Sequence, residues 1–242
     1  MLHVSLVGKP KVPSQSDTQS GCRPKSRLVL FHTSLLGVGG AERNMLEAAQ
    51  YFTEKGFEVT LLLFNLRPEA LFSQTYTPNI ELLGEITNSK NLSIRTFWRV
   101  WSLRRKLQSL KPCLVLSQGA GGCIYLYLAT LFTKIPYATY IHGTIFWFPN
   151  ETLKYTHTFR RVFGEIRNSV VGHQQFIPVA SPHLTLWGRL LDEAIAALEY
   201  LAVRKAKRIF VLSRQMAWEV KKLYGKIAVP VRGAFHDSIF SY

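Results

Sequence analysis

The sequence predicts an α/β fold: a doubly wound parallel sheet that carries helices on both faces. Short apolar runs alternate with segments of helical period along most of the 242 residues, and the connections between them are short. In addition, the run at 57–64 (FEVTLLLF) is almost continuously apolar, which is typical of a strand buried on both faces of a parallel sheet.

The first strand–helix–strand unit is expected within residues 28–64. Residues 28–34 form its first strand, and 57–64 form its second. The helix between them has an apolar face at helical spacing, and Gly56 stands where a C-terminal cap belongs. The residues of that face are Ala41, Met45, Ala48, Ala49 and Phe52.

The alternation continues along the chain. A charge-free run at 112–133 has the length of a membrane span, but the glycine-rich stretch 117–122 breaks its centre, so a strand, a turn and a helix are predicted instead. Residues 143–190 have no clear period. Ser213 is expected to cap one helix, which Gly225 ends. The other expected elements are helices at 96–110, 124–132 and 191–204, and strands at 113–117, 137–142, 209–212 and 227–231.

Composition narrows the class of protein. Hydrophobic residues make up 47% of the chain, which argues for a substantial core and against global disorder. Lys and Arg number 30 against 15 acidic residues, and the net charge of +15 favours nucleic acid, anionic lipid headgroups or nucleotide sugars as partners. The three cysteines form no Cys-x-x-Cys pair, so neither a disulfide framework nor a zinc site is expected, and a reducing compartment is the simplest interpretation.

A glycine-rich elbow at 36–43 connects the first strand to its helix. Gly39 and Gly40 leave bare backbone N–H groups at a helix N-terminus, where an anion is held favourably. A tight strand-to-helix turn without any ligand explains the same pattern. The elbow alone therefore leaves both interpretations open.

Five ordered segments resemble family 4 retaining glycosyltransferases. The opening of that family is similar to residues 39–60, which read GGAER, LEAA and GFEVT in turn. The later segments are KPCLV at 111–115, IP and YIHG within 135–143, AKRIFVLS at 206–213 and VPVRGAF at 229–235. The resemblance implies a GT-B architecture, in which two Rossmann-like domains face each other across a cleft, and it covers about residues 27–236.

Two departures from the family pattern shape the expected domain organisation. Arg232 stands where the family has Asn, and the pair of Glu residues that marks the family's donor-binding second domain is absent. Residues 1–26 are rich in Ser, Lys, Pro and Gln, which predicts a poorly ordered extension. The resemblance implies the acceptor-side domain at 27–236 and the start of an interdomain linker at 237–242, with the second domain absent. The implied function is acceptor binding in the transfer of a sugar from a nucleotide-sugar to a glycan or lipid-linked acceptor, as in polysaccharide biosynthesis, and a chain truncated in this way is expected to be inactive alone.

The resemblance also assigns roles to residues. Gly39 and Gly40 are expected beside the donor diphosphate, and His142 is expected to orient the hydroxyls of the acceptor or of the reacting sugar. No separate base is required, because retaining members are thought to pass the acceptor proton to the leaving phosphate. No metal and no cofactor are expected, since no Asp-x-Asp motif is present. The expected acceptor-binding residues are Glu42, Arg43, Asn44, Ser117, Gln118 and Gly119.

The segment 95–111 carries six basic residues and no acid, with aromatic residues between them. Its expected core-facing stripe is Phe97, Val100, Leu103, Leu107 and Leu110. The remaining face suits an anionic membrane surface, although nucleic acid or plain solvent suits it as well. The expected membrane-binding residues are Arg95, Trp98, Arg99, Trp101, Arg104 and Arg105.

Two other functions stay open from the sequence. The chain is alternatively a non-catalytic subunit that supplies acceptor and membrane binding to a separate donor-side chain. Less favoured is a basic nucleic-acid-binding module, because the basic residues cluster on one helix and no nucleic-acid motif is present. The expected location is the cytoplasm, including the cytoplasmic face of a membrane.

Overall fold

The computed structural model describes residues 26–37, 39–67, 78–84, 92–142 and 186–231. They form a seven-stranded sheet in the order β3-β2-β1-β4-β5-β6-β7, in which every pair of neighbours is parallel. The predicted doubly wound α/β fold is therefore confirmed. The strands are β1 (Arg27–Leu35), β2 (Glu58–Leu66), β3 (Asn79–Leu82), β4 (Leu114–Gln118), β5 (Tyr137–Ile141), β6 (Arg208–Val211) and β7 (Val229–Pro230).

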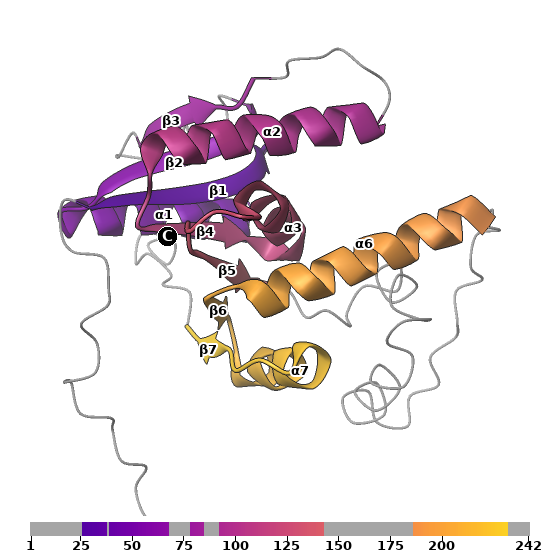
Figure 1. Ribbon diagram of the computed structural model, residues 1–242. Helices are drawn as coiled ribbons and strands as arrows, with labels where there is room; N and C mark the ends of the chain where they lie inside the picture. The colour runs from indigo at the N-terminus through magenta and orange to yellow at the C-terminus, as the bar shows by residue number, and fades with distance from the viewer. Residues whose placement is uncertain (1–25, 38, 68–77, 85–91, 143–185, 232–242) are drawn as a thin grey trace, which may run out of the picture.

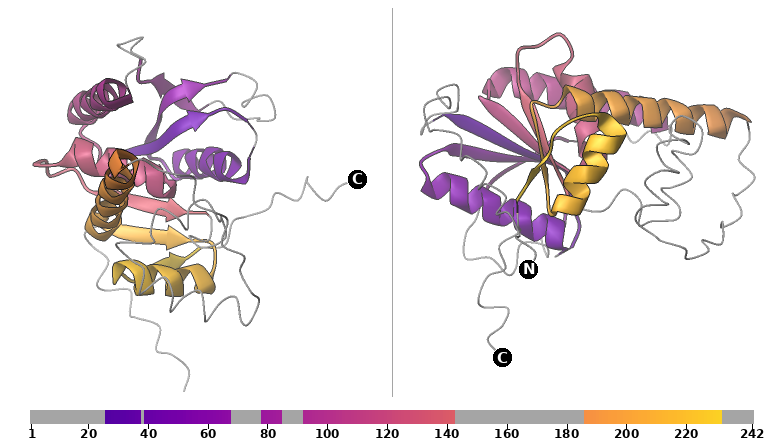
Figure 2. Two further views of the ribbon diagram at one scale, coloured as in Figure 1. Left: turned by 90° about the vertical axis from the view of Figure 1, so that its right-hand side faces the viewer. Right: turned by 90° about the horizontal axis from the view of Figure 1, so that it is seen from below.

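Helices cover both faces of this sheet (Figures 1 and 2). Among the described helices, α1 packs on one face, and α2, α3 and α6 pack over the opposite face. The last helix, α7, packs against β6, β7 and α6. The helices are α1 (Gly40–Glu54), α2 (Leu92–Leu110), α3 (Gly119–Thr130), α6 (Leu186–Lys205) and α7 (Arg214–Tyr224).

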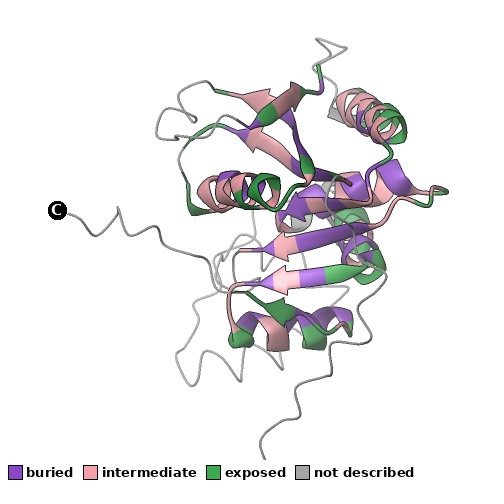
Figure 3. Ribbon diagram, turned by 90° about the vertical axis from the view of Figure 1, so that its left-hand side faces the viewer, coloured by how far each residue is buried: buried purple, intermediate pink, exposed green. Residues whose placement is uncertain are grey.

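Strand β2 shows how the sequence pattern becomes a core on both faces. Val59, Leu61 and Leu63 pack with α1, while Leu62 and Phe64 belong to the core on the other face. All five side chains are buried, as the continuous apolar run predicted (Figure 3).

The strand order reverses beside β1, and this reversal makes the carboxyl ends of β1 and β4 the expected ligand-binding edge of the sheet. The chain runs from β1 to β2 and β3 on one side, and β4 then pairs with the other side of β1. The connections after β1 and β4 consequently diverge, and ligands of open α/β sheets bind at the carboxyl ends of the strands at such a point.

The predicted helix caps of α7 are confirmed. The backbone N–H of Met216 donates to Ser213 Oγ over 3.2 Å, and Gly225 ends the helix with φ 64°. Gly56 follows α1 with φ 85°. Strands β1, β2, β4, β5 and β6 lie where the sequence predicted them, within about two residues.

Other boundaries differ from the prediction. β3 was not predicted, because a four-residue strand at the sheet edge leaves too short a pattern. α3 begins at Gly119 rather than at 124, since the φ of 72° at Gly119 turns the chain directly from β4 into the helix. The run 112–133 is a strand and a helix, and no helix among the described residues is long and apolar enough to cross a membrane.

Cys113 and Cys123 differ in oxidation state. Cys113 is disulfide-bonded, contrary to the expected absence of a disulfide framework. Cys123 on α3 is a free, buried thiol, and burial raises its pKa to about 12. Within the described ranges, no three His, Cys, Asp or Glu side chains are grouped as metal ligands. Residues 1–25 of the extension predicted at 1–26, and the linker predicted at 237–242, lie outside the described residues.

Candidate functional site at the strand ends

The carboxyl ends of β1, β4 and β5 bring the predicted site residues to one edge of the sheet. Gly39 and Gly40 follow β1, Gln118 ends β4 with Gly119 directly after it, and His142 follows β5 directly. Because β1 pairs with β4 and β4 with β5, these three strand ends are neighbours in the sheet. Residues that are far apart in the sequence therefore meet at this edge of the sheet.

Gly39 is the N-cap of α1, and its backbone is extended, with φ −79° and ψ 166°. Any L-residue adopts that conformation, so a left-handed turn is not the reason for glycine here. A Cβ built on Gly39 would lie 3.2 Å from the carboxyl carbon of Glu42. The bare Gly39 backbone is what lets the Glu42 side chain fold over it.

Glu42 occupies the third position of α1, where a carboxylate compensates the exposed N–H groups and the helix dipole. This negative charge lies over the same backbone that the resemblance assigned to a diphosphate. A phosphate placed beside Gly39 would therefore meet the negative charge of Glu42. Arg43 and Asn44, in the same turn, are half-buried.

His142 is held in a defined orientation. Its Nε2 is hydrogen-bonded to Oε1 of the buried Gln118, and its ring lies 4.1 Å from the ring centroid of Tyr140. Since Oε1 accepts, Nε2 carries the proton and Nδ1 remains as the acceptor atom.

The electrostatics around His142 keep its imidazole neutral. Burial, and to a lesser extent the nearby His32, lower the pKa of His142 to about 4, while Glu42 opposes the shift. A neutral imidazole at pH 7 accepts a hydrogen bond from a hydroxyl group through Nδ1. It does not act as a fixed positive charge for a phosphate.

Sequence reasoning missed His32, which belongs to the same cluster. His32 lies on β1, where its Nδ1 accepts a hydrogen bond from the backbone N–H of Ser34 over 3.2 Å. Burial lowers its pKa, and the Glu42 carboxylate opposes that shift. The signal in the sequence was the polar run His32–Ser34 at the end of an otherwise apolar strand.

The other acceptor-binding candidates differ in accessibility. Ser117 is fully buried, and its hydroxyl faces the thiol of Cys123. The carbonyl of Gly119 accepts a hydrogen bond from Thr139 Oγ1 over 3.3 Å, which ties the start of α3 to β5. Of the three candidates at the end of β4 and the start of α3, Gln118 thus makes the contact with His142, and Ser117 packs inside.

The membrane-binding candidates on α2 do not share one face. Arg95 and Arg99 are half-buried, and the Arg99 guanidinium lies 5.0 Å from the ring centroid of Phe64. Arg104 Nη1 donates to the carbonyl of Leu131 over 2.8 Å. These three arginines are directed toward the protein body.

The opposite side of α2 exposes apolar rings to solvent. Phe97 is 63% exposed, so its predicted place in the core is wrong, and Trp101 is 39% exposed. Trp98 is half-buried between them, with ring centroids at 5.8 Å from Phe97 and 5.3 Å from Trp101. We call these three aromatic residues, together with Ile94 one turn before them on the same side of the helix, the aromatic row.

Comparison with known proteins gives one family and several similar folds. The sequence profile described as Glycosyltransferase Family 4 matches residues 38–232. A search of curated protein sequences gives no match. Anabaena Alr3699/HepE in complex with UDP superimposes with a TM-score of 0.53 and 11% identity, over 89% of this chain and 46% of that one. A Ugt transferase from Siraitia grosvenorii in complex with UDP gives a TM-score of 0.53 and 12% identity, over 85% of this chain and 50% of that one.

The likeness to these structures shows the fold, which is the Rossmann-like α/β unit of GT-B glycosyltransferases. The chain spans about half the length of the solved structures that it matches.

Proposed function

The chain belongs to Glycosyltransferase Family 4, and from that premise we propose that it is the acceptor-side half of a retaining sugar transferase. The reaction that we propose moves a sugar from a nucleotide-sugar to a glycan or lipid-linked acceptor. The observation that carries this proposal is the neutral, oriented His142 at the strand ends, with Gln118 fixing its Nε2.

The chemistry of this edge suits hydroxyl recognition. Nδ1 of His142 is an acceptor for a sugar hydroxyl, and the lowered pKa of His142 keeps that lone pair free at neutral pH. His142 therefore positions a hydroxyl in our proposal, and the proton of the attacking hydroxyl leaves with the departing phosphate. His32 and Glu42 tune the ring from the neighbouring elements.

The nucleotide-sugar partner is supported by the UDP complexes of the two similar structures. Because this chain spans about half of each, we propose that the donor is held mainly by a further domain or a separate donor-side chain. The carboxylate of Glu42 over Gly39 fits this division, since it disfavours a diphosphate on this half alone. We expect the isolated chain to be inactive and to bind UDP-glucose weakly.

A ligand titration tests the acceptor-side role. The isolated chain is titrated with undecaprenyl-linked and free oligosaccharides, and with UDP-glucose, while amide NMR signals of residues 117–119 and 142 are followed. We expect an oligosaccharide to shift these signals and His142→Ala to abolish the shift, whereas Arg214→Gln, an exposed change on α7, leaves it intact. Tight binding of UDP-glucose without any glycan response would reverse the proposed roles.

An anionic membrane surface at the cytoplasmic face is the partner that we propose for α2. The supporting observation is the exposed aromatic row on a helix whose segment 92–110 contains no acidic residue. Vesicle co-sedimentation tests it: binding is expected to phosphatidylcholine vesicles that contain phosphatidylglycerol, and to weaken with salt. Binding to RNA or DNA but not to these vesicles would favour the nucleic-acid alternative instead.

A further inference from the structure

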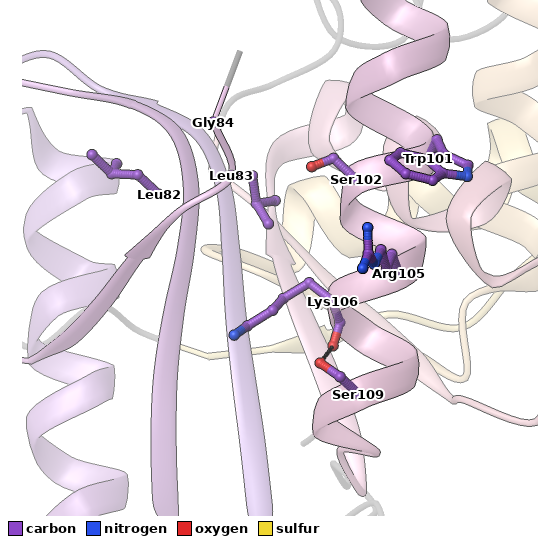
Figure 4. Close-up of a pocket in the computed structure, with 8 residues that line it drawn as sticks. All are labelled: Leu82, Leu83, Gly84, Trp101, Ser102, Arg105, Lys106 and Ser109. Atoms are coloured by element: carbon purple, nitrogen blue, oxygen red, sulfur yellow. Dashed lines mark hydrogen bonds between the residues drawn. The ribbon is translucent and has the colours of Figure 1, made fainter. Parts of the chain in front are cut away.

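A cavity of about 270 Å³ lies between α2 and the segment that follows β3 (Figure 4). One wall is formed by Leu82–Gly84, and the other by successive turns of α2. The side chains that α2 contributes are Trp101, Ser102, Arg105, Lys106 and Ser109. None of these residues belongs to the site at the strand ends.

Of the two basic residues that line this cavity, Arg105 carries the charge that is not compensated by an ion pair within the described part of the chain. Lys106 forms an ion pair with Glu81 on β3, so its charge is largely compensated. Arg105 is exposed and forms no ion pair with any of the described acidic residues. Its guanidinium lies 5.6 Å from the ring centroid of Trp101, which restrains it at the cavity.

The lining groups match a phosphate. A guanidinium presents N–H donors as a rigid fork that suits phosphate oxygens, and charge-assisted hydrogen bonds of this kind are stronger than neutral ones. The half-buried Ser102 supplies a hydroxyl one helical turn from Lys106, on the same wall. Leu82 and Leu83 make the opposite wall apolar.

The cavity adjoins the aromatic row, and this neighbouring surface indicates which class of phosphate compound suits the cavity. Trp101 belongs to both features, and Phe97 and Ile94 extend the exposed apolar surface along the same helix. Aromatic side chains of this kind favour the interface between lipid headgroups and acyl chains. This neighbouring apolar surface would contact the acyl chains of a phospholipid, whereas a soluble phosphate has no apolar part to contact it.

We propose that the cavity between α2 and the end of β3 binds the phosphate headgroup of an anionic phospholipid, while the aromatic row lies in the membrane interface. The proposal rests on the membrane partner proposed above and adds a headgroup site to it. Arg105 and Ser102 contact the phosphate, and Trp101 holds Arg105 in place.

Vesicles of equal surface charge but different headgroup chemistry test this site. One set contains phosphatidylglycerol in phosphatidylcholine, and the other contains the carboxylate lipid cholesteryl hemisuccinate at the same charge density. Wild type is expected to prefer phosphatidylglycerol, and Arg105→Gln to lose about tenfold in affinity for it, which corresponds to one charge-assisted hydrogen bond. Arg105→Lys keeps the charge without the fork and is expected to lose the preference, while Arg214→Gln retains it.

Each result decides between the two proposals. Failure of wild type to bind either vesicle overturns the membrane partner and the headgroup site together. Equal binding to both vesicles, lowered equally by Arg105→Gln, leaves the membrane partner standing and overturns the headgroup site.

A soluble probe distinguishes lipid from free phosphate. Dihexanoyl-phosphatidylglycerol below its micelle concentration is expected to shift the indole NMR signal of Trp101 in wild type but not in Arg105→Gln. Glycerol 3-phosphate that binds as tightly as this lipid would overturn the assignment to a lipid. Arg105 is exposed, so an unchanged amide spectrum of the variant is the expected control for folding.

Discussion

Polar side chains are buried and hydrogen-bonded at the strand ends of the sheet, whereas they are exposed on the outer face of α2, the side that carries the aromatic row. At the strand ends, Gln118 is buried against His142, and the imidazole is neutral and hydrogen-bonded. On the outer face of α2, Arg105 is exposed beside the exposed ring of Trp101. One region therefore orients individual atoms, and the other exposes charge and apolar surface to solvent.

The contrast extends within α2 itself. Arg99 and Arg104 have the same side chain as Arg105, yet one lies over Phe64 and the other donates to the carbonyl of Leu131. Their charges serve packing and capping rather than an external partner. Residue type alone thus does not define a binding surface, because the neighbouring elements decide which basic residues are available.

The largest expected effect is a difference in the free energy of unfolding between substitutions on the two faces of α2. Leu107→Ala removes a fully buried side chain and is expected to lower the free energy of unfolding by about 2–5 kcal/mol. Phe97→Ala, nearly three turns earlier on the same helix, is expected to change it by less than about 0.5 kcal/mol, because Phe97 is 63% exposed. Urea unfolding of both variants measures the difference. Equal destabilisation would show that Phe97 belongs to the core, as its sequence spacing suggested.

The second prediction concerns pH at the strand ends. His142 has a folded pKa of about 4, below the ordinary value of 6.5, so the unfolded chain binds the proton more tightly. Stability from this group is complete above about pH 6.5 and falls as the pH drops toward 4. Since the ring is half-buried and partly screened by solvent, the loss is expected to be roughly 1–2 kcal/mol.

NMR titration of the His142 ring measures its pKa, and urea unfolding between pH 7 and 4 measures the loss in wild type and His142→Asn. We expect the variant to lose less stability than wild type over this range. Glu42→Gln should lower the pKa of His142 further, since Glu42 is the group that opposes the shift. An ordinary pKa near 6.5 for His142 would contradict the buried, hydrogen-bonded state.

Strong local patterns explain why so much of the fold was predictable. The apolar run of β2, the Ser213 cap and the left-handed Gly225 each depend on a few adjacent residues. The β3 strand and the start of α3 were not predictable, because the first depends on pairing with β2 and the second on the single φ of Gly119. Tertiary contacts, rather than local preference, decide such elements.

The candidate site was predictable in its parts and not in their contacts. The resemblance selected Gly39, Gln118 and His142, and the sheet topology brings them to one edge. The hydrogen bond of His142 to Gln118, the participation of His32 and the fold of Glu42 over Gly39 arise from three separate strand ends. No spacing in the sequence encodes those distances.

The third prediction sharpens the difference between Arg104 and Arg105. Arg104→Ala leaves the carboxyl end of α3 without its donor at Leu131 and is expected to lower stability by about 0.5–1.5 kcal/mol. Gln108→Ala, an exposed change one turn later on α2, is the matched control and is expected to have no effect. Vesicle binding of Arg104→Ala should stay close to that of wild type, because this guanidinium is directed into the protein.

The smallest expected effect comes from Glu42, and it links the stability of α1 to ligand access at Gly39. Glu42→Gln keeps the size of the side chain but removes the charge at the helix N-terminus, so stability is expected to fall by about 0.3–1 kcal/mol at low salt. The same change removes the negative charge over the Gly39 backbone, and UDP is expected to bind the variant more tightly than wild type. Isothermal titration with UDP, alongside thermal unfolding, measures both quantities. Weaker UDP binding by Glu42→Gln would show that the carboxylate takes part in binding the donor rather than excluding it from this half.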